Sequence, residues 1–112
     1  GLPDRAAGLG ARLAAGLGRL AGNCAAICAV RGQGLMIGAE LRRHGEPLAL
    51  AADWILEEMK NRGYLIGKTG IDRNVLTFMP PLVVTPEDLD GLLDALGRVL
   101  EAAAARGSLG DD

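Results

Sequence analysis

The chain has 112 residues, of which 49% are hydrophobic and 23% charged, and its formal net charge is −2. This length is typical of one domain. The balanced charge excludes the basic surface that nucleic-acid and acidic-membrane partners require, and no apolar run reaches the roughly 20 residues of a membrane span. Because the first residue is Gly1 rather than Met, we expect an excerpt of a longer chain.

The first expected helix runs from Asp4, a residue that can cap it, to about Ala21. One apolar stripe recurs along it at helical spacing, formed by Leu9, Leu13, Leu17 and Leu20. Internal glycines loosen this helix by up to ~1 kcal/mol each relative to alanine, so we expect it to depend on tertiary packing. These glycines are Gly8, Gly10, Gly16 and Gly18.

A strand and a second helix are expected next. Leu35–Leu41 (LMIGAEL) alternates between two sets of residues and predicts a strand with one buried face. Pro47 opens a helix that runs to about Arg62, because proline suits the first helical turn. Within that helix, Trp54 is expected to be a packing anchor.

The next segment predicts an antiparallel hairpin. Its strands are Tyr64–Gly67 and Val75–Met79, and the long polar turn between them contains Lys68. Pro80 and Pro81 then end the pairing, since proline cannot donate a ladder hydrogen bond.

The last helix begins at a strong start signal. Thr85 is the expected N-cap, Pro86 occupies the first position, and acidic residues follow in the first turn. The order is therefore helix, strand, helix, strand, strand, helix, which predicts an α+β domain with a three-stranded, mostly antiparallel sheet and amphipathic helices packed on it. We assign residues 1–106 to this domain and residues 107–112 to a disordered tail.

Neither the cysteines nor the histidine predict a site. Cys24 and Cys28 are the only cysteines and His44 the only histidine, so a Cys₂His₂ zinc site is excluded and no metal is expected. Two reduced thiols packed as small hydrophobes fit a cytoplasmic protein. His44 falls in a polar turn with no partner pattern for acid–base chemistry.

Two motifs carry a resemblance. Val30–Leu41 reads VRGQGLMIGAEL, and Asn74–Thr85 reads NVLTFMPPLVVT. In this order and with their flanking helices, they resemble the C-terminal small domain of class III aminotransferases, which are pyridoxal-phosphate enzymes of fold type I. The resemblance implies a homodimeric enzyme that transfers an amino group from an amine or amino acid to an oxo acid. It also implies a large domain of the same polypeptide that holds the cofactor, with this part lining the substrate channel.

The resemblance also bears on single residues. Lys60 and Lys68 are the only lysines, and neither lies in the sequence context of the family's Schiff-base lysine. We therefore expect no catalytic and no cofactor-binding residue in this chain, and no activity from it alone. The family's substrate-carboxylate arginine, in the pattern L-R-F-x-P, is matched here by Thr77, which offers a hydroxyl but no charge. Lys68 or Arg73 is a candidate to supply the missing charge.

Arg31, at the entrance of the first motif, has two readings. It pairs with an acid or caps carbonyl groups, or it contacts substrate. For the whole protein, two alternatives to an aminotransferase stay open. One is a phospho-lyase on the same scaffold that acts on a phosphorylated amino alcohol, because such enzymes also lack the arginine at position 77. The other is a stand-alone, non-catalytic binding module.

Overall fold

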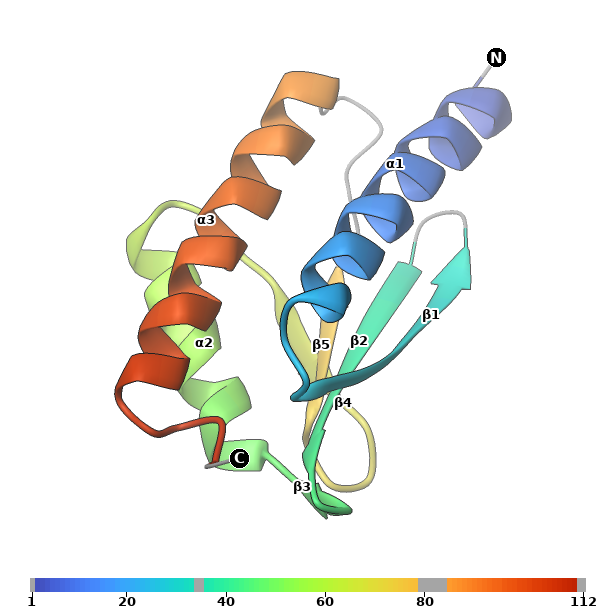
Figure 1. Cartoon of the computed structure of the whole chain (residues 1–112). Coiled ribbons are helices and arrows are strands. Elements are labelled where there is room, and N and C mark those ends of the chain that lie inside the picture. Colours follow the sequence, from blue (N-terminus) through green and yellow to red (C-terminus); the bar gives the residue numbers. More distant parts are fainter. Residues whose placement is uncertain (1, 34–35, 79–84, 111–112) are drawn as a thin grey trace.

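The computed structural model describes residues 2–33, 36–78 and 85–110, with the side chains of 2–6 and 33 left out. Figure 1 shows the arrangement of its helices and strands. In chain order they are α1 (Leu2–Gly22), β1 (Ile27–Gln33), β2 (Met36–Arg43), β3 (Glu46–Pro47), α2 (Ala49–Asn61), β4 (Gly67–Thr69), β5 (Val75–Phe78) and α3 (Pro86–Ala105). The sheet runs in the order β1-β2-β5-β4, and every pairing is antiparallel.

The predicted α+β class with an antiparallel sheet is confirmed, but three strands were too few. The described residues form five strands, and β1 and β3 are the additions. Strand β1 shows no clean alternation, because its register shifts between Ile27 and Ala29; such a bulge breaks the period-2 pattern on which strand prediction depends.

Three element boundaries also moved. Helix α1 begins at Leu2, so Asp4 lies inside the helix and does not cap it. Pro47 pairs with Arg42 in β3, so α2 begins two residues later, at Ala49. The first hairpin strand is Gly67–Thr69 and therefore includes Lys68, which the sequence analysis placed in the turn. The predicted strand end at Met79 and the proline pair Pro80–Pro81 lie outside the described residues.

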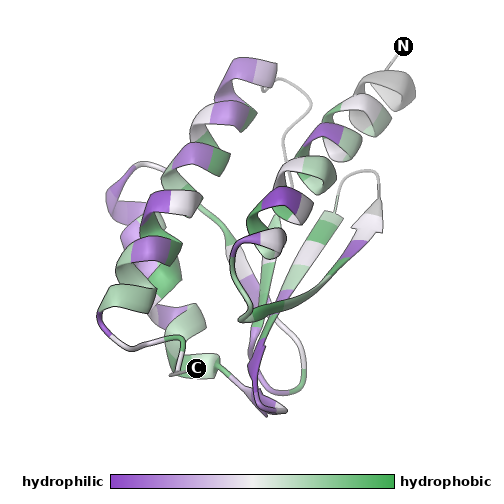
Figure 2. Ribbon diagram, viewed as in Figure 1, coloured by the Kyte–Doolittle hydropathy of each residue, from purple (hydrophilic) through white to green (hydrophobic). Residues whose placement is uncertain are grey.

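The three helices cover one face of the sheet (Figure 1). Helix α1 contacts β1 and β2, α2 contacts β4 and β5, and α3 packs against both other helices. The hydrophobic residues of α3 turn inward and its polar residues outward (Figure 2). The core that results joins α1 leucines to alternate residues of the central strands, among them Leu13, Leu17, Ile37, Leu41, Leu76 and Phe78.

Gly16 has a packing role that the sequence analysis missed. It is buried in α1, and a Cβ at this position would lie 2.2 Å from Leu93 Cδ1 of α3. The glycine therefore lets the two helices approach closely, whereas Gly8 and Gly18 have open space around them. Gly8 and Gly18 fit the expectation that the glycines merely loosen the helix, and Gly16 does not.

The end of the chain differs from the expected tail. Gly107, at φ +80°, turns the backbone after α3, and Ser108 N donates a hydrogen bond to Ala103 O at 2.9 Å. Leu109 is only 5% exposed and belongs to the core. Residues 107–110 therefore pack onto the fold, because burial of the Leu109 side chain holds this polar, glycine-rich segment against the core. Among the described residues, no helix is long and apolar enough to cross a membrane.

Candidate functional site on the open sheet face

The sheet has a second face that none of the described helices covers (Figure 1). Successive side chains of a strand point to opposite faces. Because Ile37, Ala39 and Leu41 are buried beneath the helices, their neighbours along β2 face the other way. Residues of β1, β4 and β5 that are in register with these outward-facing residues of β2 lie on the same face. We call this surface the open sheet face; its residues include Arg31, Gly38, Glu40, Arg42, Gly67, Thr69, Val75 and Thr77.

Thr77 lies near the middle of the open sheet face, between two glycines. Its register partners are Gly38 on β2 and Gly67 on β4. Neither glycine presents a side chain beside Thr77, but the Val75 side chain lies over Gly38, with its Cγ1 3.0 Å from where a Cβ would stand. Thr77 is only 7% exposed.

The hydroxyl of Thr77 has a partner that sequence reasoning missed. Thr69 Oγ1 lies 3.0 Å from Thr77 Oγ1, so one hydroxyl donates to the other. Thr69 was overlooked because it falls in the turn that the sequence predicts for the hairpin. The only sequence signal for β4 was the alternation of Gly67, Lys68 and Thr69, and three residues are too few to predict a strand.

An ion-pair cluster flanks Thr77 on the same face. Glu40 Oε1 lies 3.0 Å from Arg31 Nη1, and Glu40 Oε2 accepts a hydrogen bond from Arg42 Nε at 2.5 Å. The expectation that Arg31 pairs with an acid is confirmed. The hydrogen bond from Arg42 first, and the positive charge of Arg31 with it, lower the pKa of the Glu40 carboxyl below its ordinary value, against the opposing effect of burial.

The second arginine of the cluster is anchored elsewhere too. Arg42 Nη2 donates to Asp72 Oδ2 at 3.2 Å, and Arg42 Nη1 donates to Gly45 O at 3.0 Å. Its side chain is 33% exposed, whereas that of Arg31 is 74% exposed. Arg42 therefore ties β2 to the hairpin turn and holds Glu40 at the same time.

The two lysines lie away from Thr77. Lys68 pairs with Leu76 in the sheet register and therefore points toward the helices, where its ammonium forms an ion pair with Asp53 of α2. Lys60 is exposed in the last turn of α2. The structure thus brings Thr77 together with Thr69 and separates it from Lys68, so Lys68 does not supply the missing charge. Arg73 is exposed in the hairpin turn at φ +57°.

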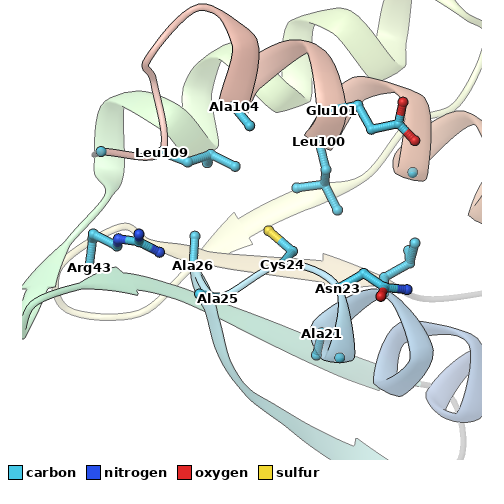
Figure 3. A pocket seen from close by; sticks show the side chains of 14 residues that line it. Ala21, Asn23, Cys24, Ala25, Ala26, Arg43, Leu100, Glu101, Ala104 and Leu109 are labelled. Atoms are coloured by element: carbon cyan, nitrogen blue, oxygen red, sulfur yellow. The ribbon is translucent and has the colours of Figure 1, made fainter. Parts of the chain in front are cut away.

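A pocket of about 740 Å³ opens on the opposite, helical side of the molecule. Figure 3 shows Cys24 and Leu100 pointing toward one another across it, with Arg43 and Leu109 farther along. The pocket therefore lies between the segment after α1 and the second half of α3, separated from Thr77 by the sheet. Within the described part of the chain, no cluster of histidine, cysteine or acidic residues could hold a metal ion.

The other residues singled out from the sequence have structural surroundings. His44 lies in the turn between β2 and β3 at φ +53°. Trp54 packs half-buried against the core, and the Arg106 guanidinium lies 4.5 Å from its ring centroid. Cys24 and Cys28 are free thiols.

The comparisons with known proteins identify the class. The model of the family called aminotransferase class-III matches residues 1–100. Alanine–glyoxylate aminotransferase 2 homolog 2 of Arabidopsis thaliana is 39% identical over 98 residues, which cover 85% of this chain and 20% of that protein. Acetylornithine aminotransferase of Methanocaldococcus jannaschii is 47% identical over 70 residues, 62% of this chain and 15% of that protein. This chain belongs to the class III aminotransferase family.

Solved structures give the same fold. A phospholyase from Arthrobacter in complex with phosphoethanolamine matches with a TM-score of 0.85 and 32% identity, over 90% of this chain and 25% of that one. A Bacillus anthracis aminotransferase matches with a TM-score of 0.83 and 28% identity, over 90% and 24%. The chain thus spans a quarter or less of these proteins.

Class III aminotransferases are pyridoxal-phosphate enzymes, and the residues of this chain can be tested against that cofactor. Its aldehyde condenses with a lysine amine that must be free to react. Lys68 is ion-paired beneath the sheet and Lys60 lies on the outer side of α2. These residues do not fit the cofactor, and no step of cofactor chemistry runs through them.

Proposed function

We propose that residues 1–106, with residues 107–110 packed onto them, are the C-terminal small domain of a pyridoxal-phosphate-dependent aminotransferase, which transfers an amino group from an amine or amino acid to an oxo acid. One observation carries this proposal: the family match over residues 1–100 in a chain that spans about a fifth of its curated relatives. The remaining length of those relatives leaves room for a large domain with the cofactor lysine. The protein is a cytoplasmic homodimer in this proposal.

The open sheet face is the side that meets the large domain and lines the substrate channel in this proposal. It is supported by the lack of a covering helix in the described chain and by the position of Thr77, which matches the family's carboxylate-binding arginine. The Thr77 hydroxyl can donate one hydrogen bond and accept two, shares one of these with Thr69, and carries no charge. It therefore orients a polar group of the substrate without forming an ion pair.

A phospho-lyase acting on a phosphorylated amino alcohol is the second candidate. It is favoured by the uncharged side chain at position 77 and by the likeness to the Arthrobacter phospholyase crystallised with phosphoethanolamine. Both candidates use the same scaffold and cofactor, so the products distinguish them.

The test compares the 112-residue chain with the full-length protein that contains it. Each is incubated with pyridoxal phosphate, dialysed and scanned for the absorbance of bound cofactor, then assayed for amino transfer to pyruvate and 2-oxoglutarate and for phosphate release from phosphoethanolamine. We expect cofactor and turnover only in the full-length protein. Stoichiometric cofactor binding by the chain alone would contradict the proposal. If the gene encodes no further domain, the stand-alone, non-catalytic binding module remains as the alternative.

A further inference from the structure

Arg31 and Thr77 lie in one row across the open sheet face with only a glycine between them. In the sheet register, Arg31 pairs with Gly38, and Gly38 pairs with Thr77. Adjacent strands are about 4.8 Å apart, so the two outer residues of the row are separated by roughly 10 Å at their backbones. Gly38 itself carries no side chain, and the side chain nearest to it is that of Val75, whose Cγ1 would lie 3.0 Å from a Cβ at Gly38. An arginine side chain that passes Val75 and lies across this glycine covers most of the distance.

The cluster around Glu40 leaves Arg31 free to move. Glu40 is held by two arginines, and Arg42 keeps its hydrogen bond to Oε2 when Arg31 leaves Oε1. The Glu40 side chain is 14% exposed, and an unpaired carboxylate in such a place would be costly. Because Arg42 stays, that cost does not arise.

The two arginines differ in how firmly they are held. Arg42 also bonds Asp72 and the Gly45 carbonyl, whereas the Arg31 side chain is 74% exposed. An exposed ion pair of this kind contributes little to stability. Arg31 is therefore the arginine of the cluster that can exchange Glu40 for another anion.

We propose that Arg31, reaching across Gly38, binds the terminal oxyanion of the substrate, a carboxylate or a phosphate, beside the Thr77 hydroxyl. This inference rests on the proposed function, because it requires substrate at the open sheet face. The guanidinium forms a forked ion pair that threonine cannot form. The charge absent from position 77 is thus supplied from the neighbouring row position on β1.

The test uses the full-length protein with three amines: 4-aminobutyrate, phosphoethanolamine and butylamine, which has no terminal anion. We expect Arg31→Gln to raise KM for the preferred anionic amine by about ten-fold or more, with kcat and the butylamine kinetics unchanged. The double variant R31Q/T77R is expected to recover most of the loss, since it returns a guanidinium to the same row. Whichever anionic amine responds identifies carboxylate or phosphate as the ligand.

Arg98→Gln is the matched control, because Arg98 is an exposed, ion-paired arginine on α3. It is expected to change no KM. If Arg31→Gln changes KM for all three amines alike, the substitution has disturbed the structure rather than an anion site. If it changes KM for none of them, Arg31 binds no substrate anion. Either result overturns the inference.

A second measurement is independent of turnover. The 112-residue chain, labelled with ¹⁵N, is titrated with inorganic phosphate while the Arg31 Nε–Hε and Thr77 amide signals are followed. We expect both to shift along one binding curve, and the Thr77 shift to vanish in R31Q. A shift of Arg31 alone overturns the inference. If the full-length protein turns over no amine, the proposed function fails, and the joint shift still decides whether Arg31 and Thr77 share an anion.

Discussion

Gly16 of α1 faces Leu93 of α3 so closely that a Cβ on the glycine would lie 2.2 Å from Leu93 Cδ1 and 3.1 Å from Leu93 Cγ. The whole isopropyl group stands in the way, so an added methyl group forces Leu93 into another rotamer. Leu93 is itself buried, and interiors of normal density tolerate such movement poorly. The contact between these helices depends on the absence of one side chain.

Gly16→Ala is therefore expected to lower the free energy of unfolding, although alanine is the better helix former. Overpacking costs typically about 1–3 kcal/mol, which exceeds the gain of up to ~1 kcal/mol in helix propensity. The control is Gly18→Ala, where a Cβ meets nothing within 4 Å, and which is expected to stabilise. Urea denaturation of both variants measures the difference; equal stabilisation by both would contradict the packing argument.

Thr85→Ala is expected to destabilise the chain by about 0.5–2 kcal/mol. Thr85 Oγ1 accepts a hydrogen bond from Asp88 N at 3.1 Å, and Asp88 Oδ2 accepts one from Thr85 N at 3.0 Å. This reciprocal capping box satisfies two donors at the start of α3. Thermal unfolding checks the prediction, and Thr85→Ser, which keeps the hydroxyl, should retain most of the stability.

Lys68→Met is expected to reduce stability and to leave cofactor content untouched. The Lys68 side chain is 13% exposed and ion-paired with Asp53, so it joins β4 to α2. Methionine keeps the apolar stem and removes the charge. Lys60→Met, at an exposed position of α2, is the matched control and should change neither quantity. Loss of pyridoxal-phosphate absorbance from a full-length Lys68→Met protein would show that this lysine holds the cofactor after all.

Glu40 gives the chain part of its sensitivity to acid. Its pKa in the folded state is lowered from the ordinary value of 4.5, chiefly by the hydrogen bond from Arg42. The unfolded chain therefore binds the proton more readily than the folded one, and the stability due to this carboxylate is present above pH 4.5. That stability is lost as the pH falls from 4.5 through the folded-state pKa.

Glu40→Gln should consequently flatten the loss of stability below pH 4.5, measured as unfolding free energy against pH. Asp90 provides a comparison, because the hydrogen bond from Arg12 on α1 also lowers the pKa of its carboxyl. The two groups lie in different parts of the fold, so the effects of Glu40→Gln and Asp90→Asn are expected to add. An unchanged acid profile in E40Q would mean that the ion-pair cluster does not persist in solution.

Leu109→Ala is expected to cost about 2–5 kcal/mol, as for other leucines removed from cores, because Leu109 is 5% exposed. Its neighbour Ser108 provides a control, since Ser108→Ala keeps the backbone hydrogen bond to Ala103 O. Equal stability of both variants, by urea denaturation, would return residues 107–110 to the status of a tail.

Prediction from sequence succeeded where a long period was available. The leucine stripe of α1 and the capped start of α3 extend over several turns, and both helices are confirmed. Failure occurred where a segment was short or irregular: β4 has three residues, and the bulge at Ile27 and Ala29 hides β1. The first hairpin strand was expected at Tyr64–Gly67 instead of Gly67–Thr69, and this shift hid the Thr69–Thr77 contact. The sequence of one strand does not specify its register with the next.

The close approach at Gly16 escaped for a related reason. The four internal glycines of α1 look alike in the sequence, and only the position of a second helix distinguishes Gly16 from Gly18. Likewise, Arg31 and Lys68 are both basic residues near the hairpin or its neighbour, and the pleat of the sheet puts them on opposite faces. Tertiary register, rather than residue type, decided which charge shares a face with Thr77.

Along β2 and β5, side chains alternate between the hydrophobic core and the open sheet face. Ile37, Ala39, Leu76 and Phe78 build the core, while their immediate neighbours along the chain face away from it. Under the proposed function, substitutions at positions such as 77 therefore change the side chains offered to substrate and leave the hydrophobic side chains of the core in place. A sheet with this separation can acquire a new substrate preference by point mutation, one strand position at a time.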